Sequence, residues 1–150
     1  MEKNAPIPMN LYFAYGSNLN LQQMKKRCPT ARLLGTGTVE DYQLLIRGRC
    51  EGESYLTVEP KQGEKVPVAA FTVEPSDVEE LDIYEDVAGG LYRIEPIRTE
   101  ISGHGMISGF WYVMNDADRL PPSQEYWDAV VEGYHDMRFD TAVLEKALKR

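Results

Sequence analysis

Short apolar runs separated by polar turns dominate the chain, and most of these runs have the length and composition of strands. They concentrate β-branched and aromatic residues, which pack well on a pleated sheet. Strands are therefore predicted over 11–15, 31–39, 42–47, 55–58, 66–73, 91–97 and 106–114. Polar or charged turns are expected at 40–41, 49–54, 61–65 and 102–105. Pro60 is expected to end the fourth strand, because proline cannot donate a ladder hydrogen bond.

The first predicted strand leads directly into a predicted helix. Leu21, Met24 and Cys28 recur at helical spacing and would form its apolar face. Ser17 or Asn18 can cap this helix, because short polar side chains accept hydrogen bonds from the first free N–H groups. The strand itself is apolar on both faces, which is typical of a buried strand.

Three further helices follow from capping and stripe patterns. Ser76 and Glu79 have the spacing of a capping box, which predicts a helix over 76–85. The segment 121–123, Pro-Pro-Ser, would open a helix with an aromatic and aliphatic stripe, and Asp140 would cap a last short helix. The order of strands and helices predicts a strand-rich α+β fold, with a closed or partly closed mixed sheet.

Length and composition are consistent with one domain covering 1–150. The 150 residues are 43% hydrophobic, which is enough for a sizeable core, and no repeat or linker divides them. Residues 1–10 contain Pro6 and Pro8 and are expected to form an irregular arm.

Charge and hydropathy narrow the range of partners. Sixteen basic and twenty-four acidic residues give a net charge of −8, which disfavours nucleic acid and anionic membranes as partners. No apolar segment is long enough to span a bilayer, and the first residues lack the apolar core of a signal peptide. A soluble, cytoplasmic protein is expected.

Cysteine and histidine are scarce and show no metal-binding pattern. Cys28 and Cys50 have no paired partner motif, which disfavours a zinc site or a disulfide framework. His104 and His135 are too far apart for metal-ligand spacing. No metal is therefore expected, and any acid–base chemistry would fall to a carboxylate.

The turn after the first strand is the first candidate site. Gly16 permits a sharp turn, and Ser17 and Asn18 follow it at the start of the helix. Free backbone N–H groups at such a turn can hold a carboxylate or a developing oxyanion. The alternative is ordinary turn and cap chemistry without a ligand.

Glu85 is the second candidate. At about 100° per residue it shares a helix face with Val78 and Leu81, so it should point toward the interior. A buried carboxylate has a raised pKa, in the range useful for proton transfer. The alternatives are that Glu85 lies at a frayed helix end or pairs structurally with Arg93.

Four segments together carry a resemblance to a known family. They are Tyr-Phe-Ala-Tyr-Gly-Ser-Asn-Leu at 12–19, Leu-Asp-Ile-Tyr-Glu at 81–85, Leu-Tyr-Arg at 91–93, and Trp-Tyr-Val-Met at 111–114 with Pro-Pro-Ser-Gln-Glu-Tyr at 121–126. In this order the chain resembles the γ-glutamylcyclotransferase-like proteins, including the plant avirulence-induced AIG2-like branch.

The resemblance implies a small mixed β-barrel flanked by helices, with a substrate cavity at one end and no cofactor. It implies that Glu85 is the acid/base residue, and that tyrosines shape the cavity around a loop which binds the γ-glutamyl group through its backbone. The substrate-binding residues so implied are Tyr15, Gly16, Ser17, Asn18, Leu19, Tyr92, Tyr112 and Tyr126. Asp86 follows Glu85 where family members commonly have glycine, which affects loop geometry and substrate choice.

The implied reaction makes modest chemical demands. The α-amine of a γ-glutamyl group attacks its own γ-carbonyl, forms 5-oxoproline and expels an amine, so that no second reactant must be captured. The enzyme would belong to the acyltransferase or lyase type. Glutathione, a γ-glutamyl amino acid, a γ-glutamyl amine or isopeptide, and a γ-glutamylated biosynthetic intermediate all share the recognised half, and the leaving amine stays open.

Two other functions and the oligomeric state also stay open. Ser17 could be the nucleophile of a hydrolase, although its turn lacks the second glycine of a nucleophile elbow and no histidine is an obvious partner. A non-catalytic γ-glutamyl-binding protein on the same fold is the other alternative. The aromatic segments near 110 and 127 can bury in the core or in a homodimer interface.

Overall fold

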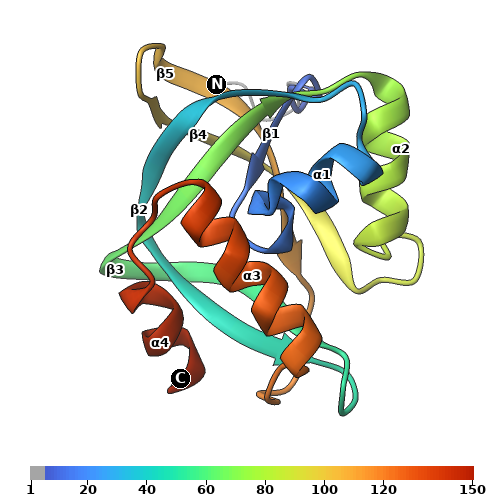
Figure 1. Ribbon diagram of the computed structural model, residues 1–150, viewed down its shortest axis with the longest axis vertical. Helices are drawn as coiled ribbons and strands as arrows, with labels where there is room; N and C mark the ends of the chain where they lie inside the picture. The colour runs from blue at the N-terminus through green and yellow to red at the C-terminus, as the bar shows by residue number, and fades with distance from the viewer. Residues whose placement is uncertain (1–5) are drawn as a thin grey trace.

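Five strands close into a barrel in the computed structural model, which describes residues 6–150, and helices cover its outside (Figure 1). The elements, in chain order, are β1 (Leu11–Ala14), a 3₁₀ turn η1 (Ser17–Leu19), α1 (Leu21–Arg27), β2 (Arg32–Gly48), β3 (Ser54–Thr72), α2 (Pro75–Tyr84), β4 (Tyr92–Ile101), β5 (Gly105–Met114), α3 (Gln124–Asp136) and α4 (Ala142–Leu148). No helix among residues 6–150 is long and apolar enough to cross a membrane. Residues 6–10 form neither helix nor strand, and the rest of the predicted arm lies outside the described residues.

The barrel is mixed, with the strand order β1-β3-β2-β4-β5. β1 pairs antiparallel with β3 and parallel with β5, where Tyr12 lies opposite Phe110. The ring closes between β2 and β4 at Gly37 and Ile101. A side chain at Gly37 would collide with the carbonyl of Glu100, so the close approach of these two strands requires glycine. The predicted α+β barrel flanked by helices is thus confirmed.

Two predicted strand breaks were wrong. β2 and β3 are single long strands that stay paired from one end to the other, and the pairing passes from Glu40 opposite Lys65 to Tyr42 opposite Pro60. Residues 61–64 bulge out at this step instead of reversing the chain. Asp41 adopts a left-handed φ of 63°, and its carboxylate accepts a hydrogen bond from Gly63 N–H at 3.0 Å. Because the bulge absorbs the extra residues, the proline does not end the strand.

The caps of α1 and α2 also differ from the prediction. Asn20, and not Ser17 or Asn18, caps α1, and its side chain accepts a hydrogen bond from Gln23 N–H at 3.1 Å. The residues before it form the separate turn η1, which displaces the start of the helix and leaves Leu21 exposed.

α2 begins at Pro75, one residue before the predicted start, and Glu74 is its N-cap. The buried carboxylate of Asp77 accepts a hydrogen bond from Glu74 N–H at 2.9 Å, so the capping box lies two residues earlier than the predicted Ser76–Glu79 pair. Pro75 explains the earlier start, because proline is favourable in the first turn of a helix and here outweighs the Ser76–Glu79 pattern.

The barrel core is aromatic, and α3 fixes the turn that follows β1. Phe110, Trp111 and Tyr112 are fully buried, so both faces are covered in the second half of β5, as the sequence predicted, whereas Met106 at its start is exposed. α3, capped by Ser123 as predicted, crosses the front of the barrel (Figure 1). Gly133 of α3 lies so close to η1 that an added Cβ would be 2.6 Å from Asn20 N.

Candidate active site

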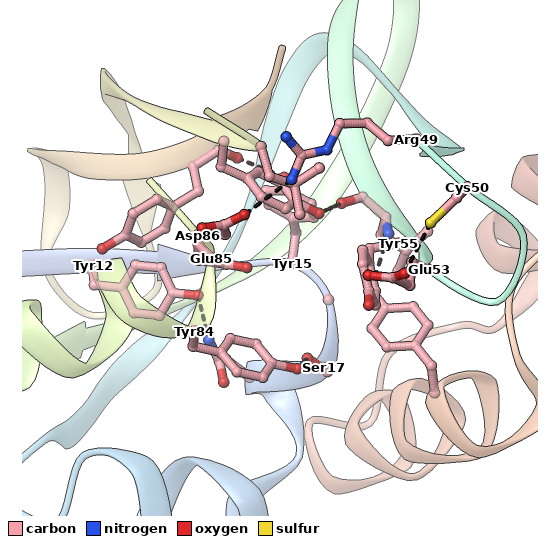
Figure 2. Close-up of a pocket in the computed structure, with 17 residues that line it drawn as sticks. Tyr12, Tyr15, Ser17, Arg49, Cys50, Glu53, Tyr55, Tyr84, Glu85 and Asp86 are labelled. Atoms are coloured by element: carbon pink, nitrogen blue, oxygen red, sulfur yellow. Dashed lines mark hydrogen bonds and ion pairs between the residues drawn. The ribbon is translucent and has the colours of Figure 1, made fainter. Parts of the chain in front are cut away.

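A cavity of about 420 Å³ opens between the turn after β1, the hairpin joining β2 to β3, the C-terminal end of α2, and α3 (Figure 2). Its buried lining, which we call the floor, consists of Tyr12, Tyr15, Ser17, Asn18, Tyr92 and Tyr112. Its outer lining, which we call the mouth, consists of Arg49, Cys50, Glu53, Tyr55 and Asp86. The two regions contain different chemistry.

Free backbone donors line the floor at the turn Gly16–Asn18. The carbonyls of Gly16 and Ser17 accept hydrogen bonds from Leu19 N–H and Asn20 N–H, both at 3.0 Å, and these bonds form the 3₁₀ turn. The N–H groups of Gly16, Ser17 and Asn18 themselves have no protein acceptor among the described residues, as is usual for the first groups of a helical turn. The loop can therefore offer N–H donors to a negatively charged ligand group.

A network of side chains fixes this turn. Asn18 donates from its amide nitrogen to the Tyr12 hydroxyl at 3.0 Å, and its amide oxygen accepts a hydrogen bond from Arg27. The Arg27 guanidinium also lies 3.4 Å from the ring centroid of Tyr84, an arrangement that favours a cation–π interaction. Ser17 shares a 2.6 Å hydrogen bond with the Tyr84 hydroxyl. Each polar side chain of the turn is thus already engaged.

The tyrosines predicted to shape the cavity do line it, together with Tyr15. Tyr92 donates to the carbonyl of Leu56 at 2.6 Å, and Tyr126 accepts from the N–H of the same residue at 3.0 Å. Tyr15 donates to the carbonyl of Tyr112 at 2.6 Å. Burial raises the pKa of each of the phenols of Tyr15, Tyr92 and Tyr126 well above the ordinary value for tyrosine. These phenols therefore stay neutral and tie β3, β5 and α3 around one space.

Glu85 lies at the point where α2 ends against the cavity. It is the C-cap residue of α2, its N–H donates to the Leu81 carbonyl at 2.9 Å, and its side chain lines the cavity beside Tyr12 (Figure 2). Burial raises the pKa of Glu85 to about 8, against the opposing effect of the nearby Arg27 cation. A carboxyl group with this pKa can both accept and donate a proton near neutral pH.

The alternative partner considered for Glu85 is engaged elsewhere. Arg93 forms an ion pair with Glu95 at 2.7 Å and donates to the carbonyl of Met114 at 3.1 Å. The suggestion that Glu85 lies at a helix end was right, but that end is held in place. Tyr112 donates to Asp82 at 2.7 Å, which ties the last turn of α2 to the barrel.

Leu19 is the one predicted site residue that does not line the cavity. Its side chain is fully buried near Gly133 of α3, and its N–H is used within the turn. Leu19 therefore supports the loop from behind and offers no group to a ligand. The other predicted residues, which are Tyr15, Gly16, Ser17, Asn18, Glu85, Tyr92, Tyr112 and Tyr126, all contribute to the lining.

The mouth contains the residues that sequence reasoning missed. Arg49 forms an ion pair with Asp86 at 2.9 Å and also donates to the carbonyl of Gly89 at 3.0 Å. Asp86 adopts a left-handed φ of 51° and accepts a hydrogen bond from Gly89 N–H at 3.1 Å. The Glu53 carboxylate accepts a hydrogen bond from the Cys50 thiol at 2.8 Å. Among these residues, the sequence drew attention only to Asp86, because it follows Glu85 at a position where glycine was expected.

Metal ligands do not gather in the part of the chain that the structure describes. No group of three or more His, Cys, Asp or Glu side chains there is arranged to hold a metal ion. The chemical groups at the site are a carboxyl group with a raised pKa and a set of backbone donors that line the same cavity.

Comparisons with known proteins show similarity to one family. The family model described as "Gamma-glutamyl cyclotransferase, AIG2-like" matches residues 12–129. The γ-glutamylcyclotransferases of Homo sapiens and Mus musculus are 26% and 27% identical over 130 residues, which cover 82% of this chain and 69% of each relative.

Solved structures show the same fold. A γ-glutamyl cyclotransferase structure superposes with a TM-score of 0.82 at 23% identity, covering 91% of this chain and 85% of that chain. YkqA from Bacillus subtilis superposes with a TM-score of 0.77 at 18% identity, covering 97% of this chain and 54% of that chain. At these identities the superpositions establish a common fold.

Proposed function

Because the chain belongs to the γ-glutamyl cyclotransferase, AIG2-like family, we propose that it cyclises a γ-glutamyl group to 5-oxoproline and releases an amine. The observation that carries this proposal is Glu85, whose carboxyl group lies in the cavity with a pKa raised to about 8. The curated relatives are named for this reaction, which supports the same conclusion.

In the first step Glu85 acts as a base. Its carboxylate takes a proton from the α-ammonium of the substrate, and the resulting amine attacks the γ-carbonyl carbon to form a five-membered ring. Since nucleophile and carbonyl belong to one molecule, holding them in a near-attack conformation supplies much of the rate. The tyrosine-lined floor would enforce that conformation.

In the second step the protonated Glu85 acts as an acid. It gives its proton to the leaving nitrogen as the bond from the γ-carbon to that nitrogen breaks, and the ring nitrogen then loses its extra proton. The α-ammonium gives up two protons in total, and both end on the leaving nitrogen, which departs as an ammonium. Charge and atoms balance without a cofactor or water.

The donors at Gly16–Asn18 would hold the negative charge of the substrate. Three N–H groups without a protein acceptor suit either the α-carboxylate or the oxyanion that forms at the γ-carbonyl. Because Ser17 and Asn18 are fixed through Tyr84, Tyr12 and Arg27, these donors need little rearrangement when charge develops.

Detection of 5-oxoproline by mass spectrometry tests the proposal. Wild-type protein, Glu85→Gln and the control Glu79→Gln, which alters an exposed carboxylate of the same helix, are incubated with a panel of γ-glutamyl amino acids and amines. We expect product from the wild type and the control, and about 10²–10⁴-fold less from Glu85→Gln. Equal product from all three proteins would exclude the proposed role of Glu85.

A second readout separates catalysis from binding. If no protein releases 5-oxoproline while γ-glutamyl compounds still raise the melting temperature, the chain is a γ-glutamyl-binding protein on this fold and the proposed reaction is wrong.

A further inference from the structure

We propose that the mouth selects γ-glutamyl amines whose leaving part carries a second positive charge, with Glu53 as the residue that recognises it. This inference rests on the proposed function, because it concerns the half of the substrate that is released. It is carried by the arrangement of charged and aromatic groups at the mouth (Figure 2).

The only cation lining the described cavity is already engaged. Arg49 donates to Asp86 at 2.9 Å through one terminal nitrogen and to the carbonyl of Gly89 at 3.0 Å through the other. A leaving amino acid would present a carboxylate, and Arg49 would have to break these contacts to bind it. The Asp86 carboxylate beside it would repel the same group. The mouth is therefore poorly suited to an anionic leaving group.

Glu53, in contrast, has a carboxylate available to a ligand. It has no ion pair among the described residues, and the hydrogen bond that it accepts comes from the neutral Cys50 thiol. With Arg49 and Asp86 offsetting each other, Glu53 gives the mouth a net charge of −1. An ammonium group would find here the opposite charge and a hydrogen-bond acceptor.

Aromatic and apolar neighbours complete this subsite. Tyr55 and Tyr126 both line the cavity, and their rings meet edge to face with centroids 5.1 Å apart. Aromatic rings beside a carboxylate are favourable surroundings for an ammonium group. Leu56 and Leu91 also line the cavity and give it apolar surface, against which an alkyl spacer can pack. The subsite thus fits a diamine attached through one nitrogen.

Three substrates of equal length test the inference. They are γ-glutamyl derivatives of 1,4-diaminobutane, pentylamine and 5-aminopentanoate, which end in an ammonium, a methyl group and a carboxylate respectively. Release of 5-oxoproline is measured at low and at high salt for the wild type, Glu53→Gln and the control Glu51→Gln. The control removes an exposed carboxylate of the same hairpin that does not line the cavity.

We expect kcat/KM of the wild type to be about threefold to tenfold higher for the ammonium compound than for the methyl compound, and lowest for the carboxylate. Glu53→Gln should remove the advantage of the ammonium, Glu51→Gln should keep it, and salt should reduce it. Turnover of the three compounds without this order, or an order unchanged by Glu53→Gln, overturns the inference and leaves the proposed reaction intact. If none of the three releases 5-oxoproline although γ-glutamyl amino acids do, the inference is overturned and the proposed reaction stands. If no γ-glutamyl compound of either set releases 5-oxoproline, both are overturned.

Discussion

The floor and the mouth of one cavity are built in opposite ways. At the floor, Tyr12, Ser17 and Asn18 are buried, and the polar side chains are linked by hydrogen bonds to residues of α1 and α2. At the mouth, Arg49 and Asp86 are about half exposed, and an ion pair joins two loops across the opening. A buried network and an exposed ion pair differ strongly in energy, because water screens the second and not the first.

This difference corresponds to the two halves of the proposed substrate. The γ-glutamyl half is common to every compound that could be cyclised, so a rigid floor suits it. The leaving half varies, and exposed loops can change without loss of stability. The comparison predicts that changes at the floor affect chemistry and stability, whereas changes at the mouth affect the choice of leaving group.

The largest expected effect is the pH dependence set by Glu85, which lines the cavity together with the floor residues. With a pKa of about 8, Glu85 is protonated at lower pH and cannot act as the base, so kcat/KM should fall about tenfold per pH unit below 8. Arg27→Met should move this limb to higher pH, because the Arg27 cation opposes the rise in the pKa. The control is Lys26→Met on the exposed face of α1. A limb that stays in place in Arg27→Met would contradict this electrostatic account.

The free energy of unfolding should also depend on the titration of Glu85. The folded protein holds the Glu85 proton up to pH 8 or so, whereas the unfolded chain releases it near the ordinary value of 4.5. The unfolded state therefore binds fewer protons within this window, and the free energy of unfolding contributed by Glu85 falls as pH rises through it. Melting temperatures from pH 4 to 9 should decline more steeply for the wild type than for Glu85→Gln, and parallel curves would argue against the raised pKa.

Two asparagine-to-alanine variants compare how much a buried and an exposed set of hydrogen bonds contribute to the free energy of unfolding. Asn18→Ala should lower the free energy of unfolding by about 1–3 kcal/mol. The variant removes the amide that bonds the buried Tyr12 hydroxyl and the partly buried Arg27 guanidinium, and water cannot easily replace it there. Asn115 donates to the carbonyl of Gly90 at 2.8 Å, in the loop that also carries the mouth residue Asp86, and it accepts a hydrogen bond from Arg93 at 3.1 Å; both bonds are exposed. Asn115→Ala should cost less than about 1 kcal/mol, since water can replace an exposed hydrogen bond. Urea unfolding measures both, and equal costs would show that the floor is no more rigid than the mouth.

At the mouth, Asp86→Gly should alter specificity more than stability. Glycine relieves the left-handed φ of 51° at this position, which offsets the lost ion pair, so the free energy of unfolding should change by less than about 1 kcal/mol. Arg49 would be released to bind an anion. Turnover of γ-glutamyl 5-aminopentanoate should therefore rise about threefold relative to the ammonium compound. An unchanged ratio would mean that Asp86 does not restrain Arg49.

Part of the floor was easier to predict from the sequence than the mouth, because its turn is one continuous segment. Tyr15, Gly16, Ser17 and Asn18 belong to this strand-to-turn segment, and the helical spacing of Glu85 indicated that its side chain points toward the interior. Tyr92 and Tyr112 come from β4 and β5, and only the family resemblance pointed to them. Leu19 belongs to the same segment but does not line the cavity, so membership of the segment does not reveal which side chains face a cavity.

The mouth depends on contacts between distant residues, which local patterns do not contain. Arg49 and Asp86 come from different loops and meet only after the barrel has closed. The same limit explains the missed bulge at Asp41. β2 was divided at the predicted turn 40–41 and β3 at Pro60 by local signals that the long-range pairing of the two strands overrides. Local periodicity predicted the elements, and the closed barrel determined which of their residues share a site.

Ser17→Ala has the smallest expected effect, and it tests whether the floor acts through its backbone or through a nucleophilic side chain. If the loop binds charge through its N–H groups, the variant loses only the hydrogen bond to Tyr84, and kcat/KM should stay within about tenfold of the wild type. Tyr84→Phe, which removes the same bond from the other side, should behave alike. Neither His104 nor His135 lines the cavity, so no histidine there could activate a serine. A loss of about 10³-fold or more in Ser17→Ala, but not in Tyr84→Phe, would instead identify Ser17 as a nucleophile and the protein as a hydrolase.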